Sequence, residues 1–244
     1  MKAIALIPAR LEASGFPRKL LTLIQGKSVL QRTYESAMNS GLFDDVVVVA
    51  DHDDLILEIT RNGGKAVKSQ GVYESGTDRI AEIAAHLDAD IFVNIQGDEP
   101  FVQKEPLQQL LNLFNDPKVQ VASLVQELHN NDDINDPNFV KVALSIHKKA
   151  LLFSRNPIPY RRDQEAPNTY YEHIGVYGFK KEALIQFTQL PMSPLEKVEK
   201  IECLRFLEND IPIHMDITNY MGIEIDTPQD IDRAIEFMNK HNLK

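Results

Sequence analysis

Three cations stand close together near the start of the chain. Arg10, Arg18 and Lys19 fall within ten residues, directly after an apolar run that predicts a buried strand. Fixed cations beside a loop that contains Ser14 and Gly15 suit a polyphosphate, because guanidinium and amide groups together neutralise its oxygens. The loop has neither the GxxxxGKS/T nor the GxGxxG pattern, so an ATPase P-loop and a dinucleotide-binding fold are not indicated. On composition alone, a solvated basic loop is the commoner explanation.

Two aspartates, far apart in the sequence, each end a strand-like run. Asp98 follows the apolar run at 91–95, and Asp226 follows the run at 222–225. A carboxylate at the carboxyl end of a strand can hold a hard cation, and Mg²⁺ prefers one or two carboxylates together with phosphate oxygens and water. Both residues also have simpler explanations, because turn aspartates are common and Asp226 could be the N-cap of the next helix. The spacing is compatible with one divalent site but does not show that the two side chains meet.

The string ESGTDR (74–79) precedes a helical pattern. Ser75 or Thr77 can cap that helix, and Asp78 suits its first turn. Such a string is more often a cap than a ligand site. Its unpaired N–H groups would nevertheless bind an anion or a base if the start of the helix faced a pocket.

The elements that must position these residues alternate over roughly the first half of the chain. Apolar runs predict strands at 2–8, 46–50, 65–69 and 91–95, and helical patterns fall at 28–39, 53–64, 78–86 and 107–114. This alternation predicts an α/β fold with a Rossmann-like, mostly parallel sheet flanked by helices. Such sheets bind ligands at the carboxyl ends of their strands, near the switch in strand order. The loops after the first, second and last of these strands are therefore the candidate site.

The second half follows a different pattern. Over 139–146, apolar residues fall at every second position, which predicts a strand with one exposed face. Further strands are predicted at 150–154 and 172–179, on either side of a stretch rich in proline and arginine. We expect a smaller antiparallel excursion over 130–180 that covers the active site or makes a dimer contact, inside a single domain of residues 1–244. Helices are expected at 181–187 and 195–206, followed by a strand at 211–217 and a closing amphipathic helix.

Composition narrows the class of partner. The 244 residues include 26 Lys and Arg against 36 Asp and Glu, a net charge of −10. This balance argues against a general nucleic-acid binder, which needs a surplus of cations, but it leaves room for a small anion in a locally basic pocket. The single cysteine, Cys203, cannot form an internal disulfide and fits a reducing compartment. No apolar run approaches the ~18–20 residues that span a membrane, and the start does not read as a signal peptide, so we expect a cytoplasmic protein.

Several strings, taken in order, resemble those of the 3-deoxy-manno-octulosonate cytidylyltransferase family. They are IPAR, ESGTDR, VNIQGDEP, DPNFVKV, LFSRNPIPY, HIGVYGF, LPMSPLEKVEKIECLR and IDTPQD. The resemblance covers essentially the whole chain. QGDEP is shared by related nucleotidylyltransferases, whereas the combination of FSR, IPY, HIGVY and SPLE is far more specific to this family.

The resemblance implies a bacterial enzyme of lipopolysaccharide precursor synthesis, active as a homodimer. It would activate 3-deoxy-D-manno-octulosonate (KDO) by the reaction CTP + KDO → CMP-KDO + diphosphate, with Mg²⁺ as cofactor. The anomeric hydroxyl of KDO would attack the α-phosphate of CTP with no covalent enzyme intermediate, so catalysis would consist of positioning and charge stabilisation.

The resemblance also assigns roles to matching positions. Arg10, Lys19, Asp98 and Asp226 would be the catalytic residues, and Asp98 and Asp226 would hold Mg²⁺. The nucleotide would be bound by Arg10, Lys19, Ser75, Gly76, Thr77, Gln96 and Asp98, to which we add Ser14 and Arg18. The sugar would be bound by Gln96, Arg155, His173, Tyr177, Glu196 and Glu199, none of which carries a distinctive signal by itself.

The chain departs from the family pattern at two places. The family usually has Arg where this chain has Gly15, and Gly where this chain has Arg18. We expect Arg18 to supply the missing charge, because Gly15 leaves room for its side chain to fold back. The second departure is Cys203, which stands where many relatives have Gln and which we interpret as a packing residue.

The sequence leaves three alternatives open. The substrate could be a close acid-sugar analogue such as 8-amino-KDO, or a sialic acid, although the residues matched to the sugar pocket favour KDO over sialic acid. A nucleotide-sugar glycosyltransferase would share the sheet and the strand-end aspartates, but the chain has no DxD triplet at QGDEP. A nucleotide-binding regulator without turnover has little need for both metal aspartates and Lys19.

Overall fold

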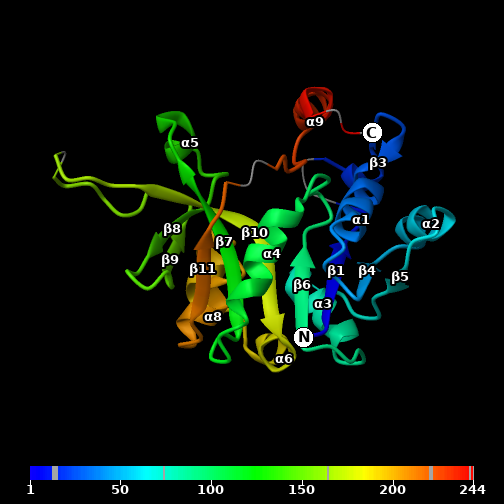
Figure 1. The fold of residues 1–244 in the computed structure, drawn as a ribbon, viewed down its shortest axis with the longest axis horizontal. Helices are drawn as coiled ribbons and strands as arrows, with labels where there is room; N and C mark the ends of the chain where they lie inside the picture. Colours follow the sequence, from blue (N-terminus) through cyan, green and yellow to red (C-terminus); the bar gives the residue numbers. More distant parts are fainter. Residues whose placement is uncertain (13–15, 74, 164, 220–221, 242, 244) are drawn as a thin grey trace. The chain divides into compact units, whose positions relative to one another are not determined.

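The computed structural model describes residues 1–12, 16–73, 75–163, 165–219, 222–241 and 243. The chain forms two compact units (Figure 1). The first consists of Met1–Leu107 and Met221–Lys244, and the second of Gln108–Tyr220. The second unit is larger than the excursion expected over 130–180, because it also takes in one strand before that segment and the helices and strand that follow it.

Four parallel strands form the sheet of the first unit, in the order β6-β1-β4-β5. They are β1 (Ala3–Ala9), β4 (Asp45–Ala50), β5 (Ala66–Lys68) and β6 (Ile91–Ile95). Every residue of β1 and β6 is buried, as continuous apolar runs predict for parallel strands covered on both faces. The chain passes from β1 to β4 and β5 on one side and then returns to β6 on the other side of β1. The strand order therefore reverses at β1, which marks the carboxyl ends of β1 and β6 as the expected ligand site.

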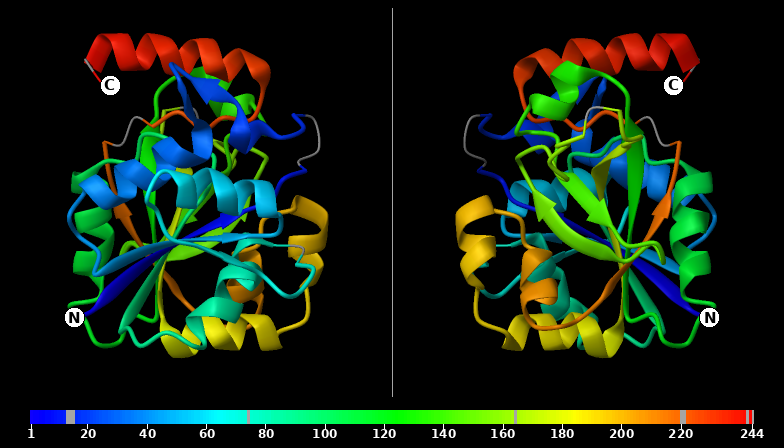
Figure 2. Two further views of the ribbon diagram at one scale, coloured as in Figure 1. Left: turned by 90° about the vertical axis from the view of Figure 1, so that its right-hand side faces the viewer. Right: turned by 90° about the vertical axis from the view of Figure 1, so that its left-hand side faces the viewer.

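Helices pack on this sheet in the sequence that the alternating pattern predicts. α1 (Val29–Asn39) contacts β1 and β4, α2 (Asp53–Arg61) contacts β4 and β5, and α3 (Gly76–Ala84) contacts β1, β4 and β6. Ser28 caps α1 by accepting the N–H of Gln31. Figure 2 shows α9 (Pro228–His241), coloured red, at the end of this unit away from Met1.

Three short elements lead into α1, and one helix spans the unit boundary. The 3₁₀ turn η1 (Lys19–Leu21) precedes a hairpin of β2 (Leu23–Ile24) and β3 (Lys27–Ser28). Gln25 and Gly26 at its tip both have positive φ, as a two-residue type I′ turn requires. α4 (Lys104–Leu113) begins in the first unit and ends in the second.

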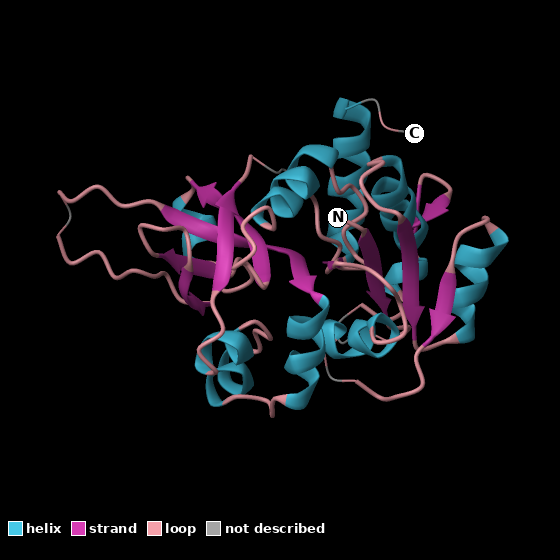
Figure 3. Cartoon of the chain, turned by 60° about the horizontal axis from the view of Figure 1, so that its bottom comes forward, coloured by secondary structure: helices cyan, strands magenta, loops and turns pink. Residues whose placement is uncertain are grey.

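The second unit is built around β7 (Val121–Leu128). β10 (Tyr170–Lys180) pairs antiparallel with β7, and β11 (Ile213–Ile217) pairs parallel with it. β8 (Lys141–Leu144) and β9 (Ala150–Ser154) pair antiparallel, and β8 also pairs antiparallel with β10. The helices of this unit, shown in cyan in Figure 3, are α5 (Asn131–Asn135), α6 (Lys181–Gln189), α7 (Pro194–Glu199) and α8 (Leu204–Glu208). The predicted fold class is confirmed: a Rossmann-like α/β arrangement with an antiparallel excursion in the second half.

Two predicted elements of the second unit differ from the structure because a lysine takes the left-handed backbone conformation. The strand expected to reach Ile146 ends at Leu144, because the chain turns back there with Lys148 at φ 54°. Ile146 is consequently 94% exposed. The helix expected over 195–206 is two helices, because Lys200 at φ 55° ends α7 in the left-handed conformation. Across the part of the chain that the structure describes, no helix is both long and apolar enough to cross a membrane.

Candidate functional site

A pocket lies in the first unit where the strand order reverses. Its walls are the loop after β1, η1, the start of α3 and the loop after β6. Of the residues predicted to bind nucleotide, the pocket is lined by Arg10, Lys19, Ser75, Gly76, Gln96 and Asp98. These side chains come from three segments of the sequence, and the carboxyl ends of two neighbouring strands bring them together.

Lys19 joins the two predicted metal aspartates. Its Nζ is 2.7 Å from Asp98 Oδ2 and 2.7 Å from Asp226 Oδ1. The Lys19 and Asp98 side chains are 13% and 16% exposed, whereas Asp226 is 59% exposed. Burial by itself would lower the pKa of Lys19, but the two carboxylates raise it above its ordinary value. Lys19 therefore stays an ammonium, and the two aspartates share one position for a cation.

Asp226 lies on the segment before α9 (Pro228–His241), which the first unit holds in place. The N–H of Ile225 donates to the Asp98 carbonyl oxygen at 3.0 Å, and the Ile225 side chain is fully buried. α9 begins at Pro228, and the N–H groups of Asp226 and Thr227 both donate to Asp230 Oδ2. Asp230 thus stabilises the start of the helix, so the N-cap explanation of Asp226 does not apply and its carboxylate faces Lys19 instead.

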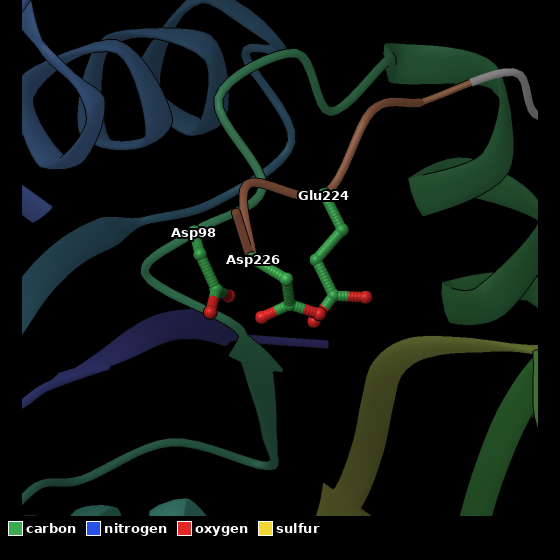
Figure 4. Close-up of side chains that lie close together, drawn as sticks. All are labelled: Asp98, Glu224 and Asp226. Atoms are coloured by element: carbon green, nitrogen blue, oxygen red, sulfur yellow. The ribbon is translucent and has the colours of Figure 1, made fainter. Parts of the chain in front are cut away.

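Glu224 is a third acidic residue at this position, which the sequence patterns did not single out. Ligand oxygens of Asp98, Glu224 and Asp226 all lie within 4.8 Å of one another, and the three side chains point into the same space (Figure 4). Partial burial and the carboxylates of Asp98, Glu99 and Asp226 raise the pKa of Glu224 well above its ordinary value. The signal was present in the string GIEID, because residues two apart in a strand-like run are expected to point to the same side.

The chemistry of this donor set fits a small divalent cation. Carboxylate oxygens are the ligands that Mg²⁺ takes from proteins. The Lys19 ammonium is equally close to Asp98 and Asp226. Its position shows that a positive charge is stabilised between the two carboxylates. Asp98, Asp226 and Glu224 are therefore the residues that could hold Mg²⁺.

The start of α3 also faces the pocket. Ser75 Oγ accepts the N–H of Asp78 at 3.0 Å and donates to Asp78 Oδ2 at 2.8 Å, so Ser75 is the cap that the sequence allowed. Ser75 and Gly76 line the pocket, where helix N–H groups favour an anion. Thr77, in contrast, is 1% exposed and accepts a hydrogen bond from Asn94. Thr77 is not among the described residues that line the pocket, so the structure does not support its predicted contact with the nucleotide.

Arg79 and Tyr73 line the pocket although neither was predicted. The Arg79 guanidinium is buried, donates from Nη1 to Ser69 Oγ at 2.8 Å and lies 3.6 Å from Asp51 Oδ2. Tyr73 donates its hydroxyl to Glu82 at 2.8 Å. The signal for Arg79 was its place one turn after Ser75 in ESGTDR, since residues four apart share a helix face. Arg79 gives the pocket a third cation beside Arg10 and Lys19.

Arg18 does not take the position expected of it. Its Nη2 lies 2.7 Å from Asp54 Oδ2 at the start of α2, and it is not among the described residues that line the pocket. Its φ of 56° is in the left-handed region that favours glycine, which accounts for the glycine that the resembling family usually has there. The contacts of Arg18 therefore do not support a role in replacing the charge lost at Gly15. Gly15 and the predicted nucleotide residue Ser14 lie outside the described residues.

Arg155 and Glu199, both predicted to bind the sugar, contact each other in the second unit. Arg155 donates from Nε to the Glu199 carbonyl oxygen at 2.8 Å, and its backbone N–H donates to Glu199 Oε2 at 3.1 Å. Ser154 Oγ donates to Glu199 Oε1 at 2.8 Å, and Arg155 Nη1 donates to the Pro137 carbonyl oxygen at 2.8 Å. These bonds hold the guanidinium group in one orientation at the end of β9.

His173 and Tyr177 come together through an irregularity in β10. The register against β7 shifts between Ile174 and Tyr177, and the rings of His173 and Tyr177 lie 4.9 Å apart. Ser123 Oγ donates its single hydrogen to the Val176 carbonyl oxygen at 2.8 Å, so it accepts from His173 Nε2 at 3.0 Å. The other ring nitrogen, Nδ1, is then an acceptor. Burial lowers the pKa of His173 to about 3, so the imidazole is neutral at neutral pH.

Glu196 is engaged in structure. Its carboxylate forms a two-point ion pair with Arg205, at 2.9 Å from Nε and 2.6 Å from Nη2. It also accepts the N–H of Ser193 as part of the capping box of α7. Both oxygens are used and the side chain is 5% exposed, so these contacts do not support the predicted sugar contact. Cys203 is 1% exposed, and burial raises the pKa of its thiol, in keeping with the packing interpretation.

Comparisons of the sequence with known proteins find cytidylyltransferases, and a comparison of the structure finds a synthetase complexed with CTP. A family model described as Cytidylyltransferase matches residues 4–217. The chain is 52% identical over 237 residues to the 3-deoxy-manno-octulosonate cytidylyltransferase of Flavobacterium johnsoniae, covering 96% of this chain and 97% of that protein. It is 47% identical over 241 residues to the protein of the same name from Christiangramia forsetii, covering 98% and 97%. The solved structure of CMP:2-keto-3-deoxy-manno-octonic acid synthetase complexed with CTP is 34% identical, with a TM-score of 0.93 over 99% of this chain and 100% of that chain.

Proposed function

The chain belongs to the 3-deoxy-manno-octulosonate cytidylyltransferase family, and from that membership we propose how its residues carry out the reaction CTP + KDO → CMP-KDO + diphosphate. The observation that carries the proposal is the Lys19 ammonium placed 2.7 Å from both Asp98 and Asp226 in the pocket of the first unit. This arrangement offers cations to a triphosphate and carboxylates to a metal in one place.

The triphosphate of CTP binds against the cations of the pocket. Arg10, Lys19 and Arg79 line it, together with the N-terminal end of α3. These groups neutralise charge that develops on the phosphate oxygens as the α-phosphorus is attacked. Gln96, at the end of β6, lines the same pocket and offers an amide that can pair with the base or the ribose.

Mg²⁺ is part of the proposal, with Asp98 and Asp226 as its protein ligands. When bound, the ion neutralises phosphate oxygens and lowers the pKa of the attacking hydroxyl. Lys19 already shares both carboxylates, so it remains beside the phosphates as a second positive charge. Asp98→Asn should abolish turnover, and near-normal activity of that variant would contradict the metal assignment.

The acid sugar is held by residues of the second unit. Arg155 is the cation for the KDO carboxylate, and its guanidinium is oriented by the Glu199 and Pro137 carbonyl oxygens. His173 is neutral with Nδ1 as an acceptor, so it accepts a hydrogen bond from a sugar hydroxyl. Tyr177 packs against the His173 ring and keeps it in place.

A cytoplasmic homodimer that supplies lipopolysaccharide synthesis completes the proposal. Exposed apolar side chains on the antiparallel excursion support a contact between copies, among them Leu151 at 62% and Tyr160 at 88% exposure. Sedimentation equilibrium of the full chain should give twice the mass of 27.7 kDa. A monomer mass at micromolar concentration would contradict the dimer.

Diphosphate release from CTP tests the substrate assignment. We expect release with KDO and Mg²⁺, and none when the sugar is left out. Release with 8-amino-KDO or a sialic acid but not with KDO would reassign the substrate within the same reaction class. Release without any sugar would indicate a hydrolase.

A further inference from the structure

The acidic cluster at the end of β6 contains one carboxylate more than the two assigned to the proposed metal site. We define this cluster as Asp98, Glu224 and Asp226, whose ligand oxygens lie within 4.8 Å of one another. One ammonium, that of Lys19, pairs with the two aspartates. Three carboxyl groups therefore face one ammonium, and a divalent cation can balance the excess negative charge.

The backbone holds Glu224 at this place. Ile225 anchors the segment through its N–H bond to the Asp98 carbonyl oxygen at 3.0 Å and through its fully buried side chain. Glu224 and Asp226 lie on either side of Ile225, and both side chains point toward the same space as Asp98 (Figure 4). The bonds to Asp230 hold the far end of the segment.

Within the described part of the chain, Glu224 is the member of the cluster that has no cation in direct contact. Among the described residues, the hydrogen bonds and ion pairs of Lys19 go to Asp98 and Asp226 and none goes to Glu224. Carboxylates placed side by side disfavour one another's charged form unless protonation, water or a cation offsets the repulsion. The ligand oxygens of Glu224 and the two aspartates lie close enough for one divalent cation to contact all three.

We propose that Glu224 is a third carboxylate of the metal site and raises its affinity for a divalent cation before CTP binds. The proposal rests on the metal site at Asp98 and Asp226 described under the proposed function. Mg²⁺ sites with one or two carboxylates rely on substrate phosphates for further oxygens. A third carboxylate, contacting the ion directly or through water, supplies part of that charge from the protein, so the metal and the nucleotide can bind in either order.

The role of Glu224 can be tested by titrating the full-length protein with Mn²⁺ in the absence of nucleotide. Electron paramagnetic resonance measures the concentration of free Mn²⁺ at each point. Glu224→Gln should weaken Mn²⁺ binding by about tenfold or more, a loss typical of groups that support a metal. Glu224→Asp keeps the charge on a shorter side chain, so its affinity for Mn²⁺ should lie between those of the wild type and Glu224→Gln. Glu236→Gln, the same change at an exposed glutamate of α9, should bind like the wild type. Thermal unfolding of each variant checks that it is folded.

The outcomes separate this inference from the proposed function. Unchanged Mn²⁺ binding by Glu224→Gln, with loss of binding by Asp98→Asn, would overturn the role of Glu224 and leave the two-aspartate site standing. An equal loss in Glu236→Gln would also overturn it, because the effect would then be one of overall charge. Absence of Mn²⁺ binding by the wild type without CTP would overturn the inference outright, whereas turnover that depends on Asp98 would still support the proposed function.

Discussion

Lys19 forms ion pairs with both Asp98 and Asp226. These contacts show which single residues form the centre of the candidate site. Residue types and motif strings predicted six of the residues that line the pocket. They could not predict that Arg18 turns away from it, because the choice depends on a backbone angle and on Asp54, a residue distant in the sequence. Glu224 was missed for a related reason: its importance comes from the place where its segment crosses the end of β6.

Arg18→Ala should leave the Michaelis constant for CTP within about twofold of the wild type. The Arg18 guanidinium pairs with Asp54 at 2.7 Å, and exposed pairs of this kind contribute little free energy. Arg10→Ala, which removes a cation that lines the pocket, should raise the same constant by about tenfold, the effect of losing a charged hydrogen bond. Steady-state kinetics with saturating KDO measure both. A large increase for Arg18→Ala would restore it to the nucleotide site.

His173 should make the protein less stable in mild acid. Its pKa is about 3 in the folded state and about 6.5 when unfolded, so between these values the unfolded chain binds more protons. The stability that the neutral imidazole contributes is complete above about pH 6.5 and decreases as the pH falls toward 3. Urea titrations at about pH 7.5 and about pH 5 give the decrease in the free energy of unfolding over this interval. This decrease should be about 1–2 kcal/mol smaller for His173→Gln than for the wild type. Identical losses in the two proteins would show that His173 is not held neutral.

At the scale of elements, patterns of apolar residues predicted the parallel strands and the helices between them. Local backbone changes were not predictable in the same way. On a regular strand, residues four apart lie about 13 Å from each other, yet the shift in register of β10 brings the rings of His173 and Tyr177 to 4.9 Å. The break at Lys200 likewise separates α7 from α8, and its φ of 55° is rare for a lysine, so periodicity alone continues the helix through it.

The ion pair between Glu196 and Arg205 should hold α7 against α8. Both side chains are at most 5% exposed, so Glu196→Gln leaves a buried guanidinium without its carboxylate. We expect the free energy of unfolding to fall by about 3 kcal/mol or more, measured by urea denaturation. Glu182→Gln, at an exposed position in α6, is the matched control and should be nearly neutral. A stable Glu196→Gln variant with a raised Michaelis constant for KDO would instead return Glu196 to the sugar site.

At the scale of the whole molecule, the net charge of −10 argues against extended polyanions as partners but says nothing about a local site. The pocket of the first unit gathers Arg10, Lys19 and Arg79, and the acidic cluster beside it suits a divalent cation. Fold class and family were readable from the sequence, because alternating elements and ordered motif strings extend over the whole chain. Contacts that join distant segments were not readable, since they depend on how the strands are ordered.

Phosphorus-31 nuclear magnetic resonance of a reaction containing CTP, KDO and Mg²⁺ tests the central claim most directly. Attack by the sugar hydroxyl on the α-phosphorus should give one phosphodiester signal, from CMP joined to KDO, and diphosphate in equal amount. The Asp98→Asn variant under the same conditions should leave the three signals of CTP unchanged. Formation of CDP and inorganic phosphate, or of free CMP without the sugar-linked phosphodiester, would contradict cytidylyl transfer to KDO.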